Sequence, residues 1–189
     1  MRLLLATRNP HKQREFARLL PGHEVAPLPE SVSLPPETGR SFAENALAKA
    51  RAVTLATGEP AVADDSGIEA AALDGAPGIF SARFAGEGAD DASNLAKLCR
   101  LAPAGSALQY VCVIAYADGG PRGEQLFEGR CTGVMAAEAR GERGFGYDPV
   151  FVPDDHCDGR TMAELTDAEK DAISHRGRAA RQLLAWLES

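Results

Sequence analysis

Apolar positions along the chain change their spacing several times, and these changes predict alternating strands and helices. Residues 2–6, with an apolar run over residues 3–6, are typical of a short buried strand. An amphipathic helix follows, with Phe16, Leu19 and Leu20 on one face and a stop at Pro21-Gly22. Asn9 is a good N-cap for this helix, and Pro10 suits its first position. A strand that leads directly into a helix is the start expected of an α/β protein.

The rest of the chain continues this alternation. A short strand near residues 24–26 and a proline-rich loop lead to a helix over residues 42–57, between a capping box that opens at Ser41 and a stop at Gly58. A brief strand at residues 61–63 ends in Asp64-Asp65-Ser66-Gly67. The later predicted elements are a helix over 91–101, a hairpin of strands over 107–117 and 125–137, and a C-terminal helical region with capping boxes at Thr161 and Thr166, a second possible start at Ser174 and an end near Leu187. This order predicts a mixed α/β domain.

Length and composition predict one folded domain over residues 1–189, in which 44% of residues are apolar and 25% are charged. The first apolar run is too short for the core of a signal peptide, and the run over residues 110–117 is too short to span a bilayer. We therefore expect a cytoplasmic protein that does not interact with membranes.

Charge is distributed unevenly along the chain. The net charge of −7 argues against a nucleic-acid partner, because proteins that bind duplexes usually carry a basic surface. Residues 1–20 nevertheless hold five basic residues against one acid, residues 170–181 hold four against one, and residues 59–74 hold five acids and no base. If these segments meet, they would suit a polyanion bound with a divalent metal. Solvated helix faces are the alternative explanation.

The first turn between strand and helix is a candidate phosphate site. Free N–H groups and the helix dipole at a helix N-terminus both favour an anion. Thr7 and Asn9 add side-chain donors, and Lys12 could bring its ammonium to the same phosphates. Any capped helix has this shape, so Asn9 acting only as a cap stays open as an alternative.

Carboxylates for a hard divalent cation are available in two places. Glu37 lies on the proline-rich loop, and Asp64 and Asp65 end the predicted third strand. Because neighbouring strand residues point to opposite sides, we expect only one of the two aspartates to face the metal. A carboxylate beside Mg²⁺ can also accept a proton from attacking water. The alternative is that the aspartates only form a turn or a cap.

Two later segments could recognise a base. His175 and Arg176 could stack on a base or donate to it, and Phe145 and Tyr147 could do the same from a glycine-rich loop, although aromatic residues in such loops are as often part of the core. The P-loop motif, the dinucleotide-binding fingerprint and the nucleophile elbow of serine hydrolases are all missing.

Taken together, six ordered motifs resemble the inosine/xanthosine triphosphate pyrophosphatase family, which hydrolyses non-standard purine nucleoside triphosphates. The motifs are LLATRNPHK at residues 4–12, ETGRSFAENALAKA at 37–50, ADDSG at 63–67, GAPGIFSARFAG at 75–86, GFGYDP at 144–149 and AELTDAEKDAISHRG at 163–177. The resemblance covers nearly the whole chain. It implies an elongated α/β domain with a long mixed sheet, two lobes flanking a substrate cleft, and a homodimer.

The resemblance also implies a role for each matching residue. Asp65 would be the catalytic proton acceptor, and Glu37 and Asp65 would hold Mg²⁺. The implied substrate-binding residues are Thr7, Arg8, Asn9, Pro10, His11, Lys12 and Lys49 for the phosphates, Ser66 as a further substrate contact, and Phe145, Gly146, Tyr147, Asp148, Lys170, His175 and Arg176 for the base. The individual role of Arg8 stays open. The implied reaction releases a nucleoside monophosphate and pyrophosphate from XTP, ITP or dITP. The rival interpretations are a related pyrophosphatase with another base preference and a nucleotide-binding protein without activity.

Overall fold

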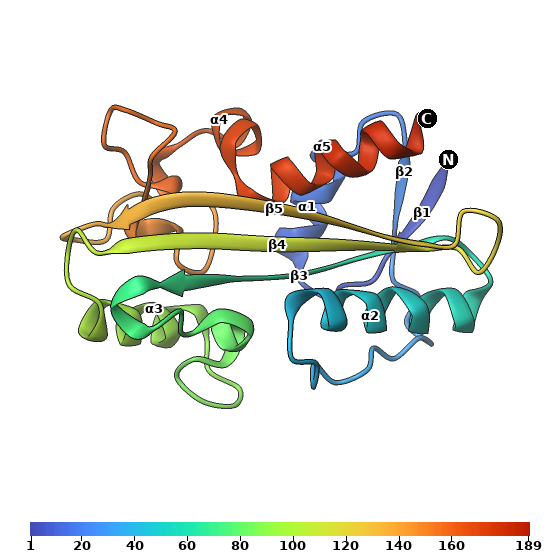
Figure 1. Cartoon of the computed structure of the whole chain (residues 1–189), viewed down its shortest axis with the longest axis horizontal. Coiled ribbons are helices and arrows are strands. Elements are labelled where there is room, and N and C mark those ends of the chain that lie inside the picture. Colours follow the sequence, from blue (N-terminus) through green and yellow to red (C-terminus); the bar gives the residue numbers. More distant parts are fainter. The chain divides into compact units, whose positions relative to one another are not determined.

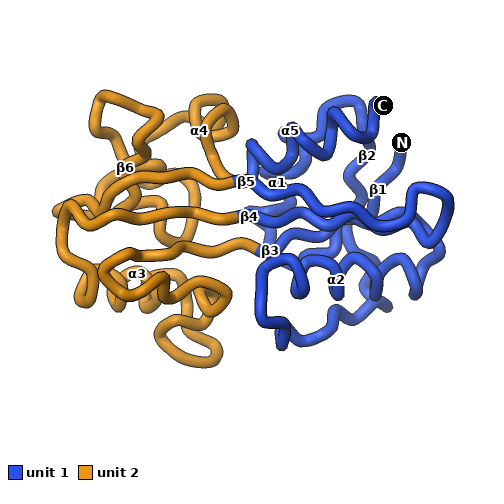
Figure 2. Tube along the Cα trace, in the orientation of Figure 1, with its two compact units in different colours: residues 1–65, 112–129, 176–189 blue, residues 66–111, 130–175 orange.

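The structure is a computed structural model that describes residues 1–189. The chain divides into two compact units, which are coloured separately in Figure 2. Unit 1 comprises residues 1–65, 112–129 and 176–189, and unit 2 comprises residues 66–111 and 130–175. Three of the strands therefore contribute residues to both units.

Six strands form one mixed β-sheet (Figure 1). They are β1 (Arg2–Leu5), β2 (Glu24–Pro27), β3 (Ala61–Ala70), β4 (Ala107–Ala117), β5 (Glu124–Met135) and β6 (Phe151–Pro153). Their order in the sheet is β2-β1-β3-β4-β5-β6. Strand β1 runs parallel to β2 and β3, whereas β5 and β6 are antiparallel. The predicted α/β class with a mixed sheet is confirmed.

The helices of unit 1 begin where their capping residues predict. Helix α1 (Pro10–Leu19) has Asn9 as its N-cap, and helix α2 (Phe42–Thr57) starts after Ser41 and ends at Gly58, whose φ of 72° suits glycine. Helix α5 (His175–Leu187) carries the C-terminal apolar positions. The core of unit 1 includes buried residues of β1, β3, β4, α1 and α5 and the C-cap of α1: Leu3, Leu5, Phe16, Leu20, Val62, Ile114, Tyr116, Ala179, Ala180 and Leu183.

Unit 2 has its own core. Its helices are α3 (Asp91–Leu101), which Asp90 caps, and α4 (Asp167–Ile173), which begins with the predicted capping box at Thr166. Unit 2 also contains four short 3-10 helices: η1 (Ala71–Leu73), η2 (Gly78–Arg83), η3 (Asp148–Val150) and η4 (Met162–Glu164). The core residues include Ile68, Leu98, Leu108, Tyr110, Cys131, Met135, Tyr147, Phe151, Met162 and Leu165.

The structure corrects the prediction for strand β3. The sequence predicts a brief strand that ends at Ala63, with Asp64 and Asp65 at its end, but both aspartates lie inside a strand of 10 residues. Aspartate is disfavoured in strands because its side chain competes for backbone hydrogen bonds. Here both carboxylates are buried and have side-chain partners: Lys12 and Arg176 for Asp64, and Asn45 and Lys49 for Asp65. The backbone hydrogen bonds of the strand therefore continue through both residues.

Two smaller differences concern helix ends. Glu44 does not complete a capping box with Ser41, because its Oε2 accepts the N–H of Arg40 instead. The C-terminal region is two helices, since Ser174 has extended backbone and separates α4 from α5. No helix is both long and apolar enough to cross a membrane.

Candidate functional site

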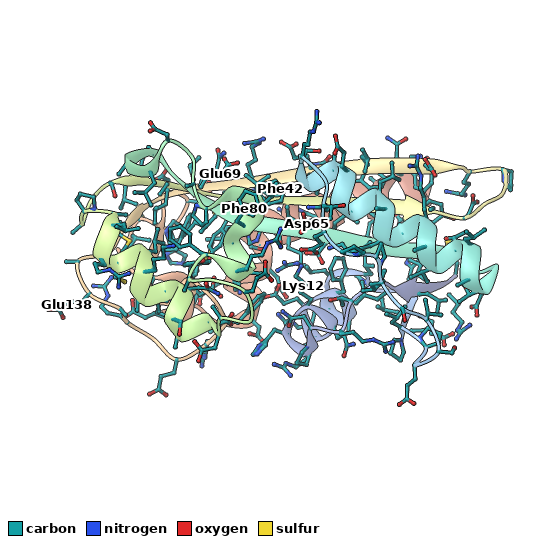
Figure 3. The ribbon with its side chains drawn as sticks, turned by 90° about the horizontal axis from the view of Figure 1, so that it is seen from below. Lys12, Phe42, Asp65, Glu69, Phe80 and Glu138 are labelled. Carbon is teal, nitrogen blue, oxygen red and sulfur yellow. The ribbon has the colours of Figure 1, made fainter.

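The turn between β1 and α1 is built by its own side chains. Oδ1 of Asn9 accepts the backbone N–H groups of His11 at 2.8 Å and Lys12 at 3.4 Å, and Oγ1 of Thr7 accepts the N–H of Asn9 at 3.1 Å. Asn9 therefore acts as the N-cap of helix α1. Lys12, in the first helical turn, forms an ion pair with Asp64 of β3. Figure 3 labels Lys12 together with Asp65 of the same strand.

Arg8 and His11 have other partners around this turn. The guanidinium of Arg8 donates to the carbonyl oxygens of Leu28 at 3.0 Å, Pro29 at 2.8 Å and Val32 at 2.9 Å. Nδ1 of His11 accepts a hydrogen bond from Nη2 of Arg14 at 2.9 Å. Arg8 thus holds the proline-rich loop, which gives a structural role to a residue whose role the sequence leaves open.

Asp64 lies at the centre of a buried ionic network. Its Oδ1 is 3.0 Å from Nζ of Lys12, and its Oδ2 is 2.9 Å from Nη2 of Arg176. The opposite side of the same guanidinium contacts Oε2 of Glu15 at 2.5 Å. Burial opposes ionisation of Asp64, yet Lys12 and Arg176 hold its pKa well below the usual range. Burial likewise disfavours the charged guanidinium, but Asp64 and Glu15 keep the pKa of Arg176 above its ordinary value.

Arg176 is therefore placed differently from the expectation. The resemblance implies that it faces the base together with His175, but its side chain is 1% exposed and belongs to unit 1, between Asp64 and Glu15. The physical reason is geometric. Consecutive residues of a helix point about 100° apart, so the neighbour of a pocket residue need not face the same pocket.

Lys49 gathers the two carboxylates that the resemblance assigns to the metal. Its Nζ donates to Oε1 of Glu37 at 2.7 Å and to the carbonyl oxygen of Asp64 at 2.6 Å, and lies 3.6 Å from Oδ1 of Asp65. Burial would lower the pKa of Lys49, but Asp64, Asp65 and Glu37 raise it overall. A buried, fully charged ammonium is thus enclosed by oxygen atoms.

Asn45 is a site residue that the sequence reasoning missed. Its Nδ2 donates to Oδ2 of Asp65 at 2.9 Å, and its Oδ1 accepts the N–H of Gly39 at 2.8 Å, two residues after Glu37. A Cβ at Gly39 would lie 2.6 Å from that Oδ1, so only glycine at this position lets the loop lie this close to Asn45. The available signal was spacing, because Asn45 and Lys49 are four residues apart and share one face of α2.

Asp65 has the electrostatic character of a proton acceptor. Burial raises its pKa, Lys49 opposes the increase, and the nearby charge of Glu37 adds to it. A carboxylate with a raised pKa holds a proton more readily than an exposed aspartate. The network therefore separates two adjacent aspartates: Asp64 is held firmly ionised and Asp65 is the more basic of the pair.

The oxygen atoms around Lys49 suit Mg²⁺ in chemical type. Magnesium is usually held by one or two carboxylates together with waters and substrate phosphates. Glu37 and Asp65 both contact Lys49, so both carboxylates already face a common cation. No group of three or more His, Cys, Asp or Glu side chains could hold a metal alone. The residues present therefore fit a magnesium ion that phosphate oxygens help to bind.

In unit 2, Asp148 joins the candidate base-binding residues. Its Oδ2 accepts from Nζ of Lys170 at 2.6 Å and from the N–H of Phe145 at 2.9 Å. The ammonium of Lys170 also lies over the Phe145 ring, 5.2 Å from its centroid. A Cβ at Gly144 would lie 2.0 Å from the same carboxylate oxygen, so the loop around Asp148 requires glycine there.

Two neighbours of this cluster differ in their surroundings. Tyr147 is 6% exposed and belongs to the core of unit 2, where its hydroxyl donates to the carbonyl of Ser81 at 2.7 Å. Burial raises its pKa. Tyr147 is thus part of the core, the alternative that the sequence left open for it. The N–H of the neighbouring Gly146 donates to Oδ2 of Asp91 at 3.0 Å. Ser66, the first residue of unit 2, is half-buried on β3.

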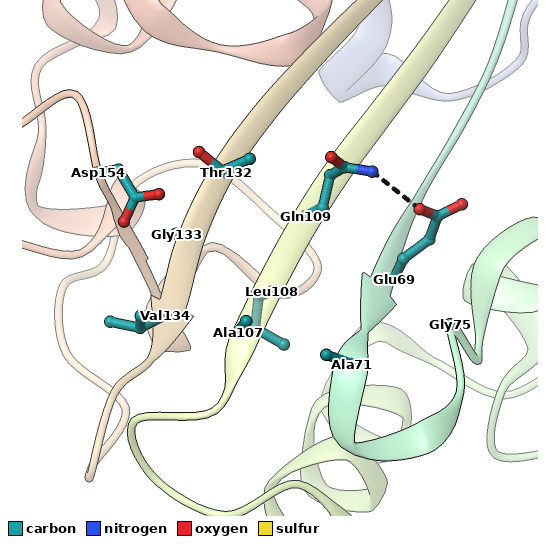
Figure 4. A pocket seen from close by; sticks show the side chains of 10 residues that line it. All are labelled: Glu69, Ala71, Gly75, Ala107, Leu108, Gln109, Thr132, Gly133, Val134 and Asp154. Carbon is teal, nitrogen blue, oxygen red and sulfur yellow. Dashed lines mark hydrogen bonds between the residues drawn. The ribbon is translucent and has the colours of Figure 1, made fainter.

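A separate hollow on the sheet of unit 2 contains none of the predicted site residues (Figure 4). Its volume is about 380 Å³. It is lined by residues of β3, β4 and β5 together with Ala71, Gly75 and Asp154. Nε2 of Gln109 donates a hydrogen bond there to Oε2 of Glu69 at 3.0 Å. The candidate site is therefore defined by its charged and aromatic clusters rather than by this hollow.

These features define a class of protein: an α/β protein without a P-loop, whose lysines and carboxylates gather at a strand-to-helix turn and along β3. The chain belongs to the Ham1 family, which matches residues 3–186. This confirms the family resemblance predicted from the six motifs.

Individual relatives agree with this assignment. The dITP/XTP pyrophosphatase of Mycobacterium tuberculosis (strain ATCC 25618 / H37Rv) is 47% identical, with 100% of this chain and 96% of that protein covered. Among solved structures, a HAM1 protein from Coxiella burnetii is 41% identical with a TM-score of 0.87, and the alignment covers 100% of this chain and 98% of that one. The Staphylococcus aureus Ham1 protein is 38% identical with a TM-score of 0.84, at the same two coverages.

Proposed function

We propose that this protein hydrolyses the non-canonical purine nucleoside triphosphates XTP, ITP and dITP to the monophosphate and pyrophosphate. The observation that carries the proposal is the buried cluster in which Lys49 contacts Glu37 and Asp65 while Lys12 contacts Asp64. Its lysines suit a triphosphate and its carboxylates suit a divalent cation. The names of the similar dITP/XTP pyrophosphatases support the choice of substrates.

In the proposed reaction, water attacks the α-phosphorus and pyrophosphate leaves with its electron pair. Asp65 accepts the proton of the attacking water, which its raised pKa favours. Lys12 and Lys49 bind the phosphate oxygens and stabilise the charge of the leaving pyrophosphate. Mg²⁺ bound to Glu37 and Asp65 would supply further charge neutralisation. Asp64 holds Lys12 in place through its ion pair.

Base recognition is assigned to residues of unit 2. Lysine offers only donors, so Lys170 suits the 6-carbonyl of hypoxanthine or xanthine and not the 6-amino group of adenine. Phe145 and His175 would supply ring surfaces for the base. Arg176 is assigned instead to the network that holds Asp64.

The remaining expectations belong to the same proposal. The whole chain would act as one functional domain and form a homodimer, with a nucleoside triphosphate as its substrate and no nucleic-acid or membrane partner. A cytoplasmic location would place it with the nucleotide pool. Size-exclusion chromatography with light scattering tests the dimer, because a monomer mass at micromolar concentration would contradict it.

The function is tested by incubating the protein with Mg²⁺ and a panel of triphosphates and identifying both products. We expect ITP, dITP and XTP to yield monophosphate and pyrophosphate faster than ATP or GTP. Stepwise release of orthophosphate would contradict the proposed reaction. Preference for another base would favour a related pyrophosphatase, and tight binding without any product would favour a protein that only binds nucleotides.

A further inference from the structure

Tyr110 contacts two of the candidate base-binding residues, Asp148 and His175. It lies outside the six sequence motifs. It lies on β4 in unit 2 and is 6% exposed. Its hydroxyl donates to Oδ1 of Asp148 at 3.1 Å. Its ring stacks on the imidazole of His175, with centroids 4.5 Å apart and planes within 8°.

The hydrogen bond from Tyr110 restricts the orientation of the Asp148 carboxylate, because the other carboxylate oxygen is also engaged. Its Oδ2 holds Lys170 and the N–H of Phe145, whereas Oδ1 receives the hydroxyl of Tyr110. A carboxylate held at both oxygens has little freedom to rotate. The position of the Lys170 ammonium, 2.6 Å from that carboxylate, depends on this orientation.

Tyr110 is itself firmly held. Its ring also packs against Phe151, with centroids 4.5 Å apart, and both residues belong to the core of unit 2. A buried ring on a sheet strand is a rigid support, since few rotamers are compatible with close packing. Tyr110 therefore connects the sheet to a lysine on α4 and to a histidine at the start of α5.

We propose that Tyr110 is a positioning residue for base selection. Its hydroxyl orients Asp148, and thereby Lys170, and its ring sets the plane of His175. Tyr110 itself does not contact the base. This inference rests on the proposed function, because it assumes that Lys170 donates to the 6-carbonyl of the base.

The inference predicts a loss that depends on the base. Displacing the Lys170 ammonium weakens recognition of substrates that carry a 6-carbonyl, namely ITP, XTP and GTP. Adenine has a 6-amino group, which cannot accept from lysine, so ATP has nothing to lose at this position. A residue that only stabilised the fold would instead affect all triphosphates equally.

Tyr110→Phe tests this, because it removes the hydroxyl and keeps the ring. We expect kcat/KM for ITP to fall roughly 10-fold, the scale of one hydrogen bond to a charged group, and ATP hydrolysis to change less than about 2-fold. Most of the loss should be in KM, since base binding is present before the reaction starts.

Tyr116→Phe is the matched control. Tyr116 lies on the same strand, is 1% exposed and packs edge-on to Trp186, but belongs to unit 1. Its substitution also removes a tyrosine hydroxyl that donates a hydrogen bond, in this case to the side chain of Asp118. We expect the ratio of ITP to ATP activity to stay at the wild-type value, with both variants monitored by thermal unfolding.

The outcomes separate this inference from the proposed function. If the wild-type protein hydrolyses ITP to pyrophosphate but Tyr110→Phe leaves the ITP:ATP ratio unchanged, or lowers both activities equally, the positioning role is overturned and the function stands. If the wild-type protein hydrolyses no purine triphosphate, the proposed function fails and this inference fails with it.

Discussion

The candidate site residues of unit 1 are connected mainly by charge, whereas those of unit 2 surround a single ion pair with rings. In unit 1, three cations and four carboxylates alternate through buried contacts: Lys12, Lys49 and Arg176 with Glu15, Glu37, Asp64 and Asp65. In unit 2, the pair of Lys170 and Asp148 is flanked by Tyr110, Phe145 and His175.

This difference matches the two chemical parts of a nucleotide. A triphosphate is a polyanion, so lysines such as Lys12 and Lys49 suit its phosphate oxygens, and the carboxylates that contact these lysines fix their positions. A purine is flat and neutral, so stacking surfaces and one or two directed donors distinguish it. Variants in unit 1 should therefore change stability or the rate with every base, and variants in unit 2 should change selectivity.

The largest expected effect is on stability, from Arg176→Leu in unit 1. The substitution leaves Glu15 and Asp64 buried without the guanidinium that both contact. Breaking a buried ion pair from one side typically costs about 3–5 kcal/mol, so we expect a loss of that size in the free energy of unfolding measured with urea. Arg40→Leu, at an exposed position of unit 1, should change it by less than about 0.5 kcal/mol. Equal stabilities for the two variants would show that the network does not stabilise unit 1.

Asp65→Asn should have the largest effect on catalysis. The amide keeps the shape of the side chain and can still accept from Asn45, but it cannot take a proton from water. We expect kcat to fall at least about 100-fold for every base at saturating Mg²⁺, with the fold retained. The exposed Asp74→Asn serves as the control variant. A near wild-type kcat for Asp65→Asn would remove Asp65 from the chemistry.

Lys170→Met should change selectivity in unit 2 instead. Removing the ammonium should lower kcat/KM for ITP roughly 10-fold, the scale of a charge-assisted hydrogen bond, and leave ATP hydrolysis nearly unchanged. Lys97→Met is a close control, because Nζ of Lys97 also lies over a ring, that of Phe84 at 4.4 Å, and donates to a backbone carbonyl. Equal losses for ITP and ATP would mean that Lys170 holds phosphate or structure.

Local signals predicted the elements, whereas the contacts within the candidate site depend on residues far apart in the sequence. The capping residues Asn9, Ser41 and Thr166 predicted helix starts correctly, because a cap acts within one turn. The continuation of β3 through Asp64 could not be predicted, since it depends on Arg176, which is 112 residues away in the sequence. Asn45 and Tyr110 were missed for the same reason: each is an ordinary buried residue until its tertiary partner is known.

The smallest expected effect is that of Glu37→Gln, because Glu37 lies at the more exposed edge of the unit 1 network. Its side chain is 30% exposed, compared with 7% for Asp65, so solvent screens its charge more strongly. Glutamine keeps an oxygen that can accept from Lys49 but loses the negative charge that attracts a cation. We expect an increase of about 3- to 10-fold in the Mg²⁺ concentration that gives half-maximal activity, with kcat at saturation nearly unchanged.

The Mg²⁺ dependence of the unfolding temperature should shift in the same direction, which gives a readout that does not rely on turnover. Glu30→Gln removes an exposed carboxylate from the same proline-rich loop and should leave both titrations at the wild-type values. If Glu37→Gln also leaves them unchanged, Glu37 does not hold the metal, and its contact with Lys49 serves only to fix the lysine beside Asp65.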